Sequence, residues 1–175
     1  MNSELIEIII IRGAPGSGKS QTAKSLSEFF PRGVRLEIDT IRSMVISADW
    51  TNQDEHVSML AASVNLVQDF MKQGFSPIIV VDTFSGGKLV QYLINLNRLK
   101  TKLAVQIIGL YTSDEELTRR IEARPHGEFK DSSICHSLND EVRNEKYDGE
   151  YQIDTTGLLP IETAKLIYAK LDDPT

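Results

Sequence analysis

The sequence of 175 residues predicts an α/β fold in three layers, with a central parallel sheet between two layers of helices. Strand-like apolar runs alternate with helical segments along the whole chain, which is typical of parallel sheets whose strands are joined by helices. The runs lie at residues 5–11, 34–38, 77–81, 103–111 and 151–154. Because no repeat, low-complexity tract or linker interrupts this order, we expect a single domain over residues 1–175.

The expected helices are marked by apolar spacing and by capping residues. One helix follows the first strand over residues 19–30, and another is expected over residues 54–73, ended by Gly74. The second has apolar residues at three- and four-residue steps, which predicts one buried stripe: Val57, Leu60, Ala61, Val64, Val67 and Met71. Ser113 followed by Glu116 forms a capping-box pattern, and Pro160 opens a final helix.

The composition excludes several classes of protein. A hydrophobic content of 41% and a charged content of 25% are ordinary for a globular domain, and the net charge of −6 provides no overall attraction for nucleic acid. No apolar stretch approaches the roughly 20 residues of a membrane span, and the start "MNSELIE" lacks a basic signal-peptide region. The single cysteine, Cys135, fits a reducing cytoplasm. We therefore expect a cytoplasmic monomer or homodimer without membrane contact.

The segment "GAPGSGKS" at residues 13–20 matches the P-loop pattern directly after the first strand. Its glycines allow phosphate to approach the backbone, and its amides and the following helix N-terminus attract the anion. Lys19 would reach the β- and γ-phosphates, and the Ser20 hydroxyl would hold Mg²⁺. The alternative is a purely structural strand-turn-helix that is rich in glycine and serine. The expected ATP-binding residues here are Gly13, Ala14, Pro15, Gly16, Ser17, Gly18, Lys19, Ser20 and Gln21.

Ligands of such sheets bind beyond the carboxyl ends of the strands, and "IDTIR" follows the second strand. Asp39 could accept a proton from an attacking hydroxyl group. Arg42, one helical turn further on, could hold the substrate or balance charge on the transferring phosphoryl group. The same spacing also fits a helix cap followed by a solvated arginine, and the sequence leaves both interpretations open.

The third strand ends in "VVDTF", and an acid in this position is the Walker B arrangement. Asp82 would then orient Mg²⁺ directly or through water, together with Ser20. A cap for the next helix is the alternative role of Asp82. The three histidines show no ligand spacing, so we expect no bound transition metal.

The segment "TSDEELTRRIEARPHGEF" follows the fourth strand and combines a helix with a polar loop. Arg120 and Arg124 share one helix face, whereas Arg119 points away from it. We expect a lid over about residues 113–136 whose arginines close on the nucleotide phosphates. The alternative is a solvated helix in which Glu116 pairs with Arg119 or Arg120.

Together these motifs, with the C-terminal "IDTTGLLPIETA", resemble the small P-loop kinases grouped around polynucleotide kinase, chloramphenicol phosphotransferase and zeta-type toxins, which are AAA-like ATP-binding kinases. The resemblance covers nearly the whole chain and implies a P-loop NTPase fold with strand order 2-3-1-4-5. It implies that Asp39 is the general base and that Arg42 contacts the acceptor or its phosphate. It further implies that Arg120 and Arg124 bind ATP phosphates, and that the segment from Thr155 to Gly157 borders the adenine.

The sequence therefore predicts an ATP- and Mg²⁺-dependent phosphotransferase that acts on a hydroxyl group of a small molecule. A polynucleotide 5′-hydroxyl kinase is an alternative. It is less favoured because the net charge is acidic and because Phe84 stands where polynucleotide kinases often have a polar residue. A nucleotide-binding regulatory ATPase without an acceptor is another. Trp50 could stack on a substrate ring or serve in packing.

Overall fold

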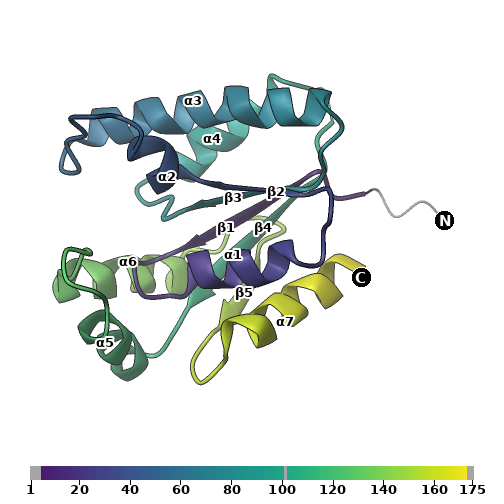
Figure 1. Ribbon diagram of the computed structural model, residues 1–175. Coiled ribbons are helices and arrows are strands. Elements are labelled where there is room, and N and C mark those ends of the chain that lie inside the picture. The colour runs from purple at the N-terminus through teal and green to yellow at the C-terminus, as the bar shows by residue number, and fades with distance from the viewer. Residues whose placement is uncertain (1–4, 101, 173–175) are drawn as a thin grey trace.

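The computed structural model describes residues 5–100 and 102–172, and a five-stranded parallel sheet lies at its centre (Figure 1). The strands are β1 (Ile8–Gly13), β2 (Val34–Glu37), β3 (Ile78–Asp82), β4 (Val105–Tyr111) and β5 (Tyr151–Asp154). Their order is β2-β3-β1-β4-β5, and every pairing between neighbours is parallel. The predicted fold class and strand order are confirmed.

Helices cover both faces of the sheet. One layer contains α2 (Ile38–Arg42), α3 (Gln53–Lys72) and α4 (Lys88–Asn97), and the opposite layer contains α1 (Lys19–Ser27) and α7 (Pro160–Asp172) (Figure 1). The remaining two, α5 (Asp114–Glu122) and α6 (Ser132–Asn144), lie at the end of the sheet where the P-loop opens. Across the described ranges, no helix has the length and apolar character needed to cross a membrane.

The core is divided by the sheet into two apolar clusters. Ile8 and Ile10 of β1 pack with side chains of α3 and α4, whereas Ile9 and Ile11 pack with those of α1 and α7. All four isoleucines are fully buried. A strand covered on both faces needs apolar residues at successive positions, and this explains the unbroken isoleucine run in the sequence.

The buried face of α3 differs from the predicted stripe. Leu60, Val64 and Val67 are buried as expected, but Val57 is 46% exposed and Ala61 is also exposed. His56 and Ser63 take inward positions instead, together with Leu60. The hydroxyl of Ser63 donates to the Leu60 carbonyl at 2.7 Å and lies 2.9 Å from the hydroxyl of buried Tyr92. The prediction was therefore wrong at Val57 and Ala61 only, and polar residues with hydrogen-bond partners occupy part of the buried face.

A buried ion pair lies directly before the P-loop. Glu150 accepts hydrogen bonds from Arg12 Nε at 2.7 Å and Arg12 Nη2 at 3.1 Å, and both side chains are fully buried. Glu150 also accepts from the backbone amide of Tyr147, and the Arg12 guanidinium lies 4.6 Å from the centre of the Tyr147 ring. Arg12 further donates to the carbonyl of Glu145, which follows α6. These contacts fix the α6–β5 connection to the strand that leads into the P-loop.

Candidate active site

The P-loop leaves β1 at Gly13 and enters α1 at Lys19. Gly16 and Gly18 have φ angles of 88° and 95°, which non-glycine residues rarely adopt. A Cβ atom on Gly13 would clash with Ser17 Oγ and lie 2.7 Å from the carbonyl oxygen of Leu110. Ser17 Oγ is buried without a hydrogen-bond partner among the described residues. The loop therefore has the glycine-dependent shape that a nucleotide phosphate site requires.

Lys19 lies among the acidic residues of the sheet edge. Its Nζ donates to the Ala14 carbonyl at 3.1 Å, across the loop. Burial lowers the pKa of Lys19, while the negative charges of Asp82 and Asp39 act in the opposite direction. The structure therefore brings Lys19, Asp39 and Asp82, all expected site residues, within electrostatic reach of one another.

Asp39 lies in the first turn of α2, and the residue that precedes this helix is Glu37. Asp39 is exposed at the surface, but the surrounding protein removes part of the water around its carboxyl group, and this desolvation raises its pKa. The negative charge of Asp82 acts in the same direction. The positive charges of Lys19, His56 and Arg42 act against this rise. An accessible carboxylate with a raised pKa is well suited to accept a proton.

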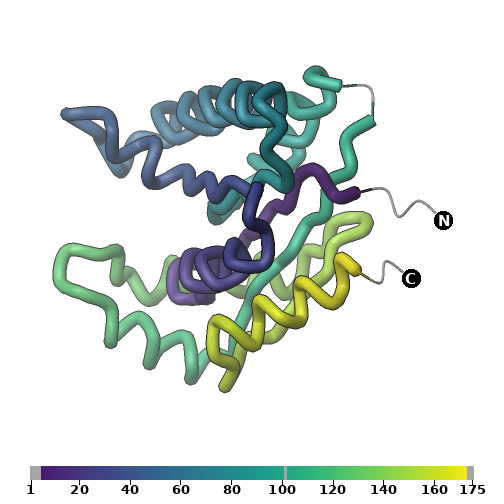
Figure 2. The backbone as a smooth tube through the Cα atoms, turned by 45° about the vertical axis from the view of Figure 1, so that its right-hand side comes forward, coloured from purple at the N-terminus to yellow at the C-terminus, as the bar shows by residue number. Residues whose placement is uncertain are grey.

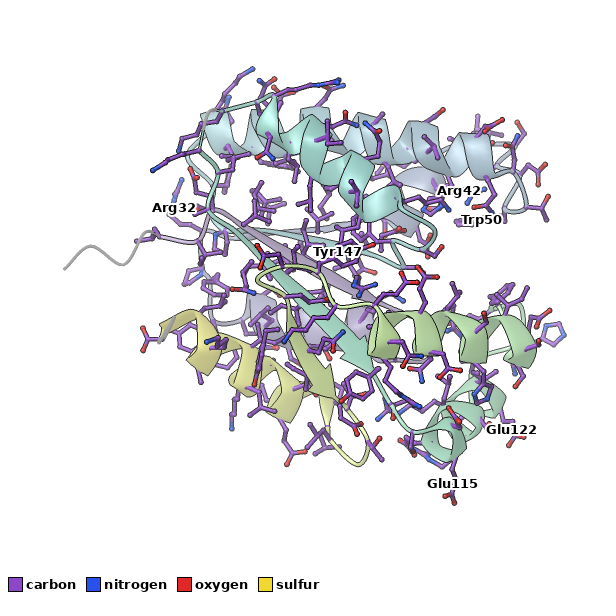
Figure 3. All side chains as sticks on the ribbon, turned by 180° about the vertical axis from the view of Figure 1, so that it is seen from behind. Arg32, Arg42, Trp50, Glu115, Glu122 and Tyr147 are labelled. Carbon is purple, nitrogen blue, oxygen red and sulfur yellow. The ribbon has the colours of Figure 1, made fainter. Side chains whose placement is uncertain are left out.

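Arg42 is buried and is engaged by the segment that joins α2 to α3. Its Nε donates to Glu55 at 3.2 Å, and its Nη2 donates to the carbonyls of Asn52, at 3.0 Å, and of Asp49. The guanidinium carbon lies 4.9 Å from the centre of the Trp50 ring, and Figure 3 shows the two side chains together at one end of the molecule. The interpretation of Arg42 as a solvated arginine is therefore excluded.

Asp82 ends β3 beside Arg12 of β1 and forms two hydrogen bonds within the protein. Its Oδ2 accepts from the backbone amide of Phe84, and its Oδ1 lies 2.9 Å from Nε2 of His56. The other ring nitrogen of His56 lies 3.1 Å from Nζ of Lys88. The cap of α4 is Gly87, so Asp82 does not cap that helix. Sequence analysis missed His56, although extending the buried stripe of α3 by one turn would have found it.

A second missed residue is Glu37, the last residue of β2. Its Oε2 accepts a hydrogen bond from Ser20 Oγ at 2.9 Å. The rule that ligands bind at the carboxyl ends of strands could have identified this position. In the described part of the chain, no group of three or more His, Cys, Asp or Glu side chains is arranged to hold a metal.

Arg120 of α5 reaches the P-loop and the end of β5. It donates to Thr155 Oγ1 at 2.9 Å, to the Thr155 carbonyl at 2.8 Å and to the Ser17 carbonyl at 3.4 Å. Glu116 pairs with both Arg119 and Arg120 at 2.7 Å, and hydrogen bonding, from Arg119 first, lowers the pKa of Glu116 to about 2. Two expected nucleotide-binding residues, Arg120 and Thr155, therefore meet beside the loop.

A pocket of about 280 Å³ lies between the P-loop, α5 and the start of α7. It contains the expected residues Gln21 and Thr155 together with apolar groups from the β5–α7 connection. Gly157 forms a turn in that connection with a φ angle of 72°, but it does not line the pocket. The lining residues are Ser17, Gly18, Gln21, Thr22, Glu116, Arg119, Arg120, Thr155, Leu158, Leu159, Pro160 and Thr163. The mixture of apolar and polar groups next to the phosphate loop suits a nucleotide base.

Arg124 lies just beyond α5. Its Nη2 is paired with Glu128 at 2.8 Å, whereas its Nε is buried without a hydrogen-bond partner among the described residues. Its charge is close enough to lower the pKa of Lys19. The structure thus brings both arginines of the predicted lid to the P-loop.

The sheet order and the phosphate loop define a P-loop fold of the kinase type. Within that class the chain belongs to the AAA domain family, whose model matches residues 8–141. The family resemblance predicted from the sequence is confirmed. No relative was found among curated protein sequences.

Solved structures with this fold include several kinases. The Deinococcus radiodurans tunicamycin resistance protein is 20% identical with a TM-score of 0.72, over 95% of each chain. The Acinetobacter baumannii shikimate kinase is 16% identical with a TM-score of 0.66, over 98% of this chain and 96% of that one. A Sinorhizobium meliloti gluconokinase is 20% identical with a TM-score of 0.65, over 94% and 90%. These similarities establish the fold.

Proposed function

We propose that the protein is an ATP- and Mg²⁺-dependent phosphotransferase that moves the γ-phosphate to a hydroxyl group of a small molecule. The observation that carries the proposal is the position of Asp39, an accessible carboxylate that interacts electrostatically with P-loop Lys19. A loop that only bound nucleotide would not need an additional carboxylate in this position.

In the proposed reaction Asp39 takes the proton from the acceptor hydroxyl. The acceptor oxygen then forms a bond to the γ-phosphorus, and the bond from that phosphorus to the β–γ bridging oxygen breaks. ADP leaves with the electron pair of the broken bond, and the acceptor carries the phosphoryl group. The raised pKa of Asp39 strengthens the carboxylate as a base.

Charge on the transferring group would be stabilised by Lys19 together with Arg120 and Arg124. Arg120 lies on α5 and Arg124 lies two residues beyond its end, so we propose that residues 113–136 act as the lid. Both arginines are paired with glutamates, Glu116 and Glu128. A nucleotide phosphate would compete with these carboxylates for the guanidinium groups as the lid closes.

Ser20 of the P-loop is hydrogen-bonded to Glu37, and together with Asp82 these are the residues that would hold Mg²⁺. When bound, Mg²⁺ neutralises phosphate charge. Asp82 is already held by His56 and the Phe84 amide, so we expect it to act through water.

For Arg42 we propose a positioning role. Sequence reasoning expected a direct contact with the acceptor, but its guanidinium already binds Glu55 and two backbone carbonyls. Its contribution would be to fix the segment between α2 and α3 beside Asp39.

An ADP-release assay with a panel of hydroxyl acceptors tests the proposal. We expect turnover that depends on an acceptor, and its abolition in Lys19→Ala, because the nucleotide phosphates lose their fixed cation. ADP release at one rate with every acceptor and with none would instead indicate a regulatory ATPase. Turnover only with 5′-hydroxyl oligonucleotides, falling steeply with salt, would indicate a polynucleotide kinase.

A further inference from the structure

Lys88, the first residue of α4, is a partly buried lysine beside the proposed active site. It follows β3, which ends at Asp82, so it lies at the carboxyl end of a parallel strand, where ligands of such sheets bind. Its Nζ donates to Oε1 of Gln53 at 2.7 Å and lies 3.1 Å from Nδ1 of His56. These two contacts hold the ammonium group at the first turn of α3.

Neither partner supplies a negative charge for Lys88. An ammonium group can only donate hydrogen bonds, so Nδ1 of His56 is the acceptor here, and the other ring nitrogen faces Asp82. In the part of the chain that the structure describes, no carboxylate pairs with Lys88. The acids nearby are engaged elsewhere, Asp82 with His56 and Glu55 with Arg42. Lys88 is therefore a cation that is held in place without a counter-charge.

The start of α4 adds to the positive potential around Lys88. The N-cap of this helix is Gly87, and within α4 neither a side-chain cap nor an acidic residue in the first turn balances the positive end of the helix dipole. Just before the helix, the backbone amide of Gly86 donates to Glu141 of α6 at 3.0 Å. That contact binds a carboxylate at the turn before α4 but leaves Lys88 unpaired.

Lys88 lies on the side of the sheet that carries Asp39. Its partner His56 acts electrostatically on Asp39, and so does Arg42, whose Nη1 has no hydrogen-bond partner among the described residues. Figures 1 and 2 show α2, α3 and α4, which carry these residues, together on one side of the sheet, with α1 and α7 on the other. The pocket that suits a nucleotide base borders α1 and α7. A molecule bound between Asp39 and Lys88 would therefore not compete with the base.

We propose that the acceptor carries an anionic group, either a carboxylate or a phosphate ester, and that Lys88 binds this group while the acceptor hydroxyl reaches Asp39. The anion would supply the counter-charge that the described residues do not provide, through a charge-assisted hydrogen bond. Nη1 of Arg42 is a second donor at the same turn of α3. The inference rests on the proposed phosphotransferase function and adds the chemical class of its substrate.

Two matched series of compounds test the proposal by calorimetric titration with Mg²⁺ and a non-hydrolysable ATP analogue bound. Glucose, glucuronate and glucose 6-phosphate share one ring and differ at one carbon atom, and glycerol, glycerate and glycerol 3-phosphate form the second series. In at least one series we expect an anionic member to bind at least about tenfold more tightly than the uncharged one, because hydrogen bonds between charged groups are stronger. The two anionic members show whether a carboxylate or a phosphate ester is preferred. Equal affinities within both series would overturn the inference.

Lys88→Met is the test variant, and Lys165→Met is its matched control on the opposite side of the sheet, where Lys165 is exposed on α7. Lys88→Met should lose most of the preference for the anionic member, and Lys88→Arg, which keeps the charge, should retain part of it. The preference is a ratio of two affinities in one variant, so a smaller folded fraction would not imitate its loss. Lys165→Met should keep the full preference. An equal loss in the test variant and the control would show a non-specific charge effect and overturn the proposal.

ADP release with the same compounds and with the wider acceptor panel separates this inference from the function on which it rests. Preferential binding of the anionic members, without ADP release from any acceptor, would support the anion site and contradict the transferase. ADP release with an uncharged acceptor at the same KM in the wild type and in Lys88→Met would support the transferase and overturn the inference. Turnover only with a 5′-hydroxyl oligonucleotide would also overturn it, because the acceptor would then be a nucleic acid.

Discussion

The substitution Glu150→Gln would remove the charge that neutralises Arg12 directly before the P-loop. Both side chains of this pair are fully buried, with Nε and Oε1 2.7 Å apart. The uncharged amide would leave a buried guanidinium without its counter-charge, and breaking a buried pair in this way costs about 3–5 kcal/mol. For a chain of this length, each kcal/mol lowers the melting temperature by roughly 2–4 °C, so we expect a drop of about 6–20 °C.

Thermal and urea unfolding of Glu150→Gln measure this effect, and Glu7→Gln is the matched control. Glu7 pairs with Lys100 at the same distance of 2.7 Å, but both side chains are partly exposed, so its loss should cost no more than about 1 kcal/mol. The double variant Arg12→Met/Glu150→Leu should recover much of the stability, because it removes both charges together. If Glu150→Gln were no less stable than the control, the argument from burial would be refuted.

Two further predictions concern the phosphate site. Gly13→Ala should sharply weaken ATP binding in a nucleotide titration, because the new Cβ would clash with Ser17 and displace the loop; unchanged affinity would contradict the loop geometry. Asp39→Asn should be more stable than the wild type at pH 7 and equally stable at pH 3. The native pKa of Asp39 is raised above its value in the unfolded chain. Ionisation of this carboxyl group therefore lowers the free energy of unfolding as the pH rises from about 4 through the native pKa, and asparagine does not ionise. Urea unfolding at both pH values would detect it, and a less stable variant at pH 7 would show that Asp39 is structurally required.

Much of the fold could be predicted because local patterns and tertiary packing agree. The isoleucine run of β1 indicates a strand buried on both faces, and Gly13, Gly18 and Lys19 occupy the positions that the phosphate-loop pattern requires. The predicted order of the sheet depended on the family resemblance, because spacing along a chain does not define which strands are neighbours. The hydrogen bond between His56 and Asp82 escaped prediction, since the two residues lie 26 positions apart in the sequence.

The sequence indicated which residues gather at the candidate site, but it did not indicate most of the contacts that they make. Asp39, Lys19 and Asp82 were expected to converge because the carboxyl ends of parallel strands share one edge. The partners of Arg42 were not predictable, because two of them are backbone carbonyls of an irregular segment whose course has no periodic pattern. The contact of Glu37 with Ser20 was missed for another reason. In the sequence, a glutamate that ends an edge strand resembles an ordinary surface residue, and only the structure shows its hydrogen bond with Ser20.

Single-turnover phosphate transfer by Asp39→Asn tests the central claim most directly, with the best acceptor from the panel. Asparagine keeps the size of the side chain but cannot take the acceptor's proton, so the transfer step should slow by about 10²–10⁴-fold. ATP affinity, measured by titration of the same preparation, should stay nearly unchanged, because Asp39 contributes no positive charge to the phosphate site. Transfer at the wild-type rate would contradict the assignment of Asp39 as the general base and, with it, the proposed mechanism.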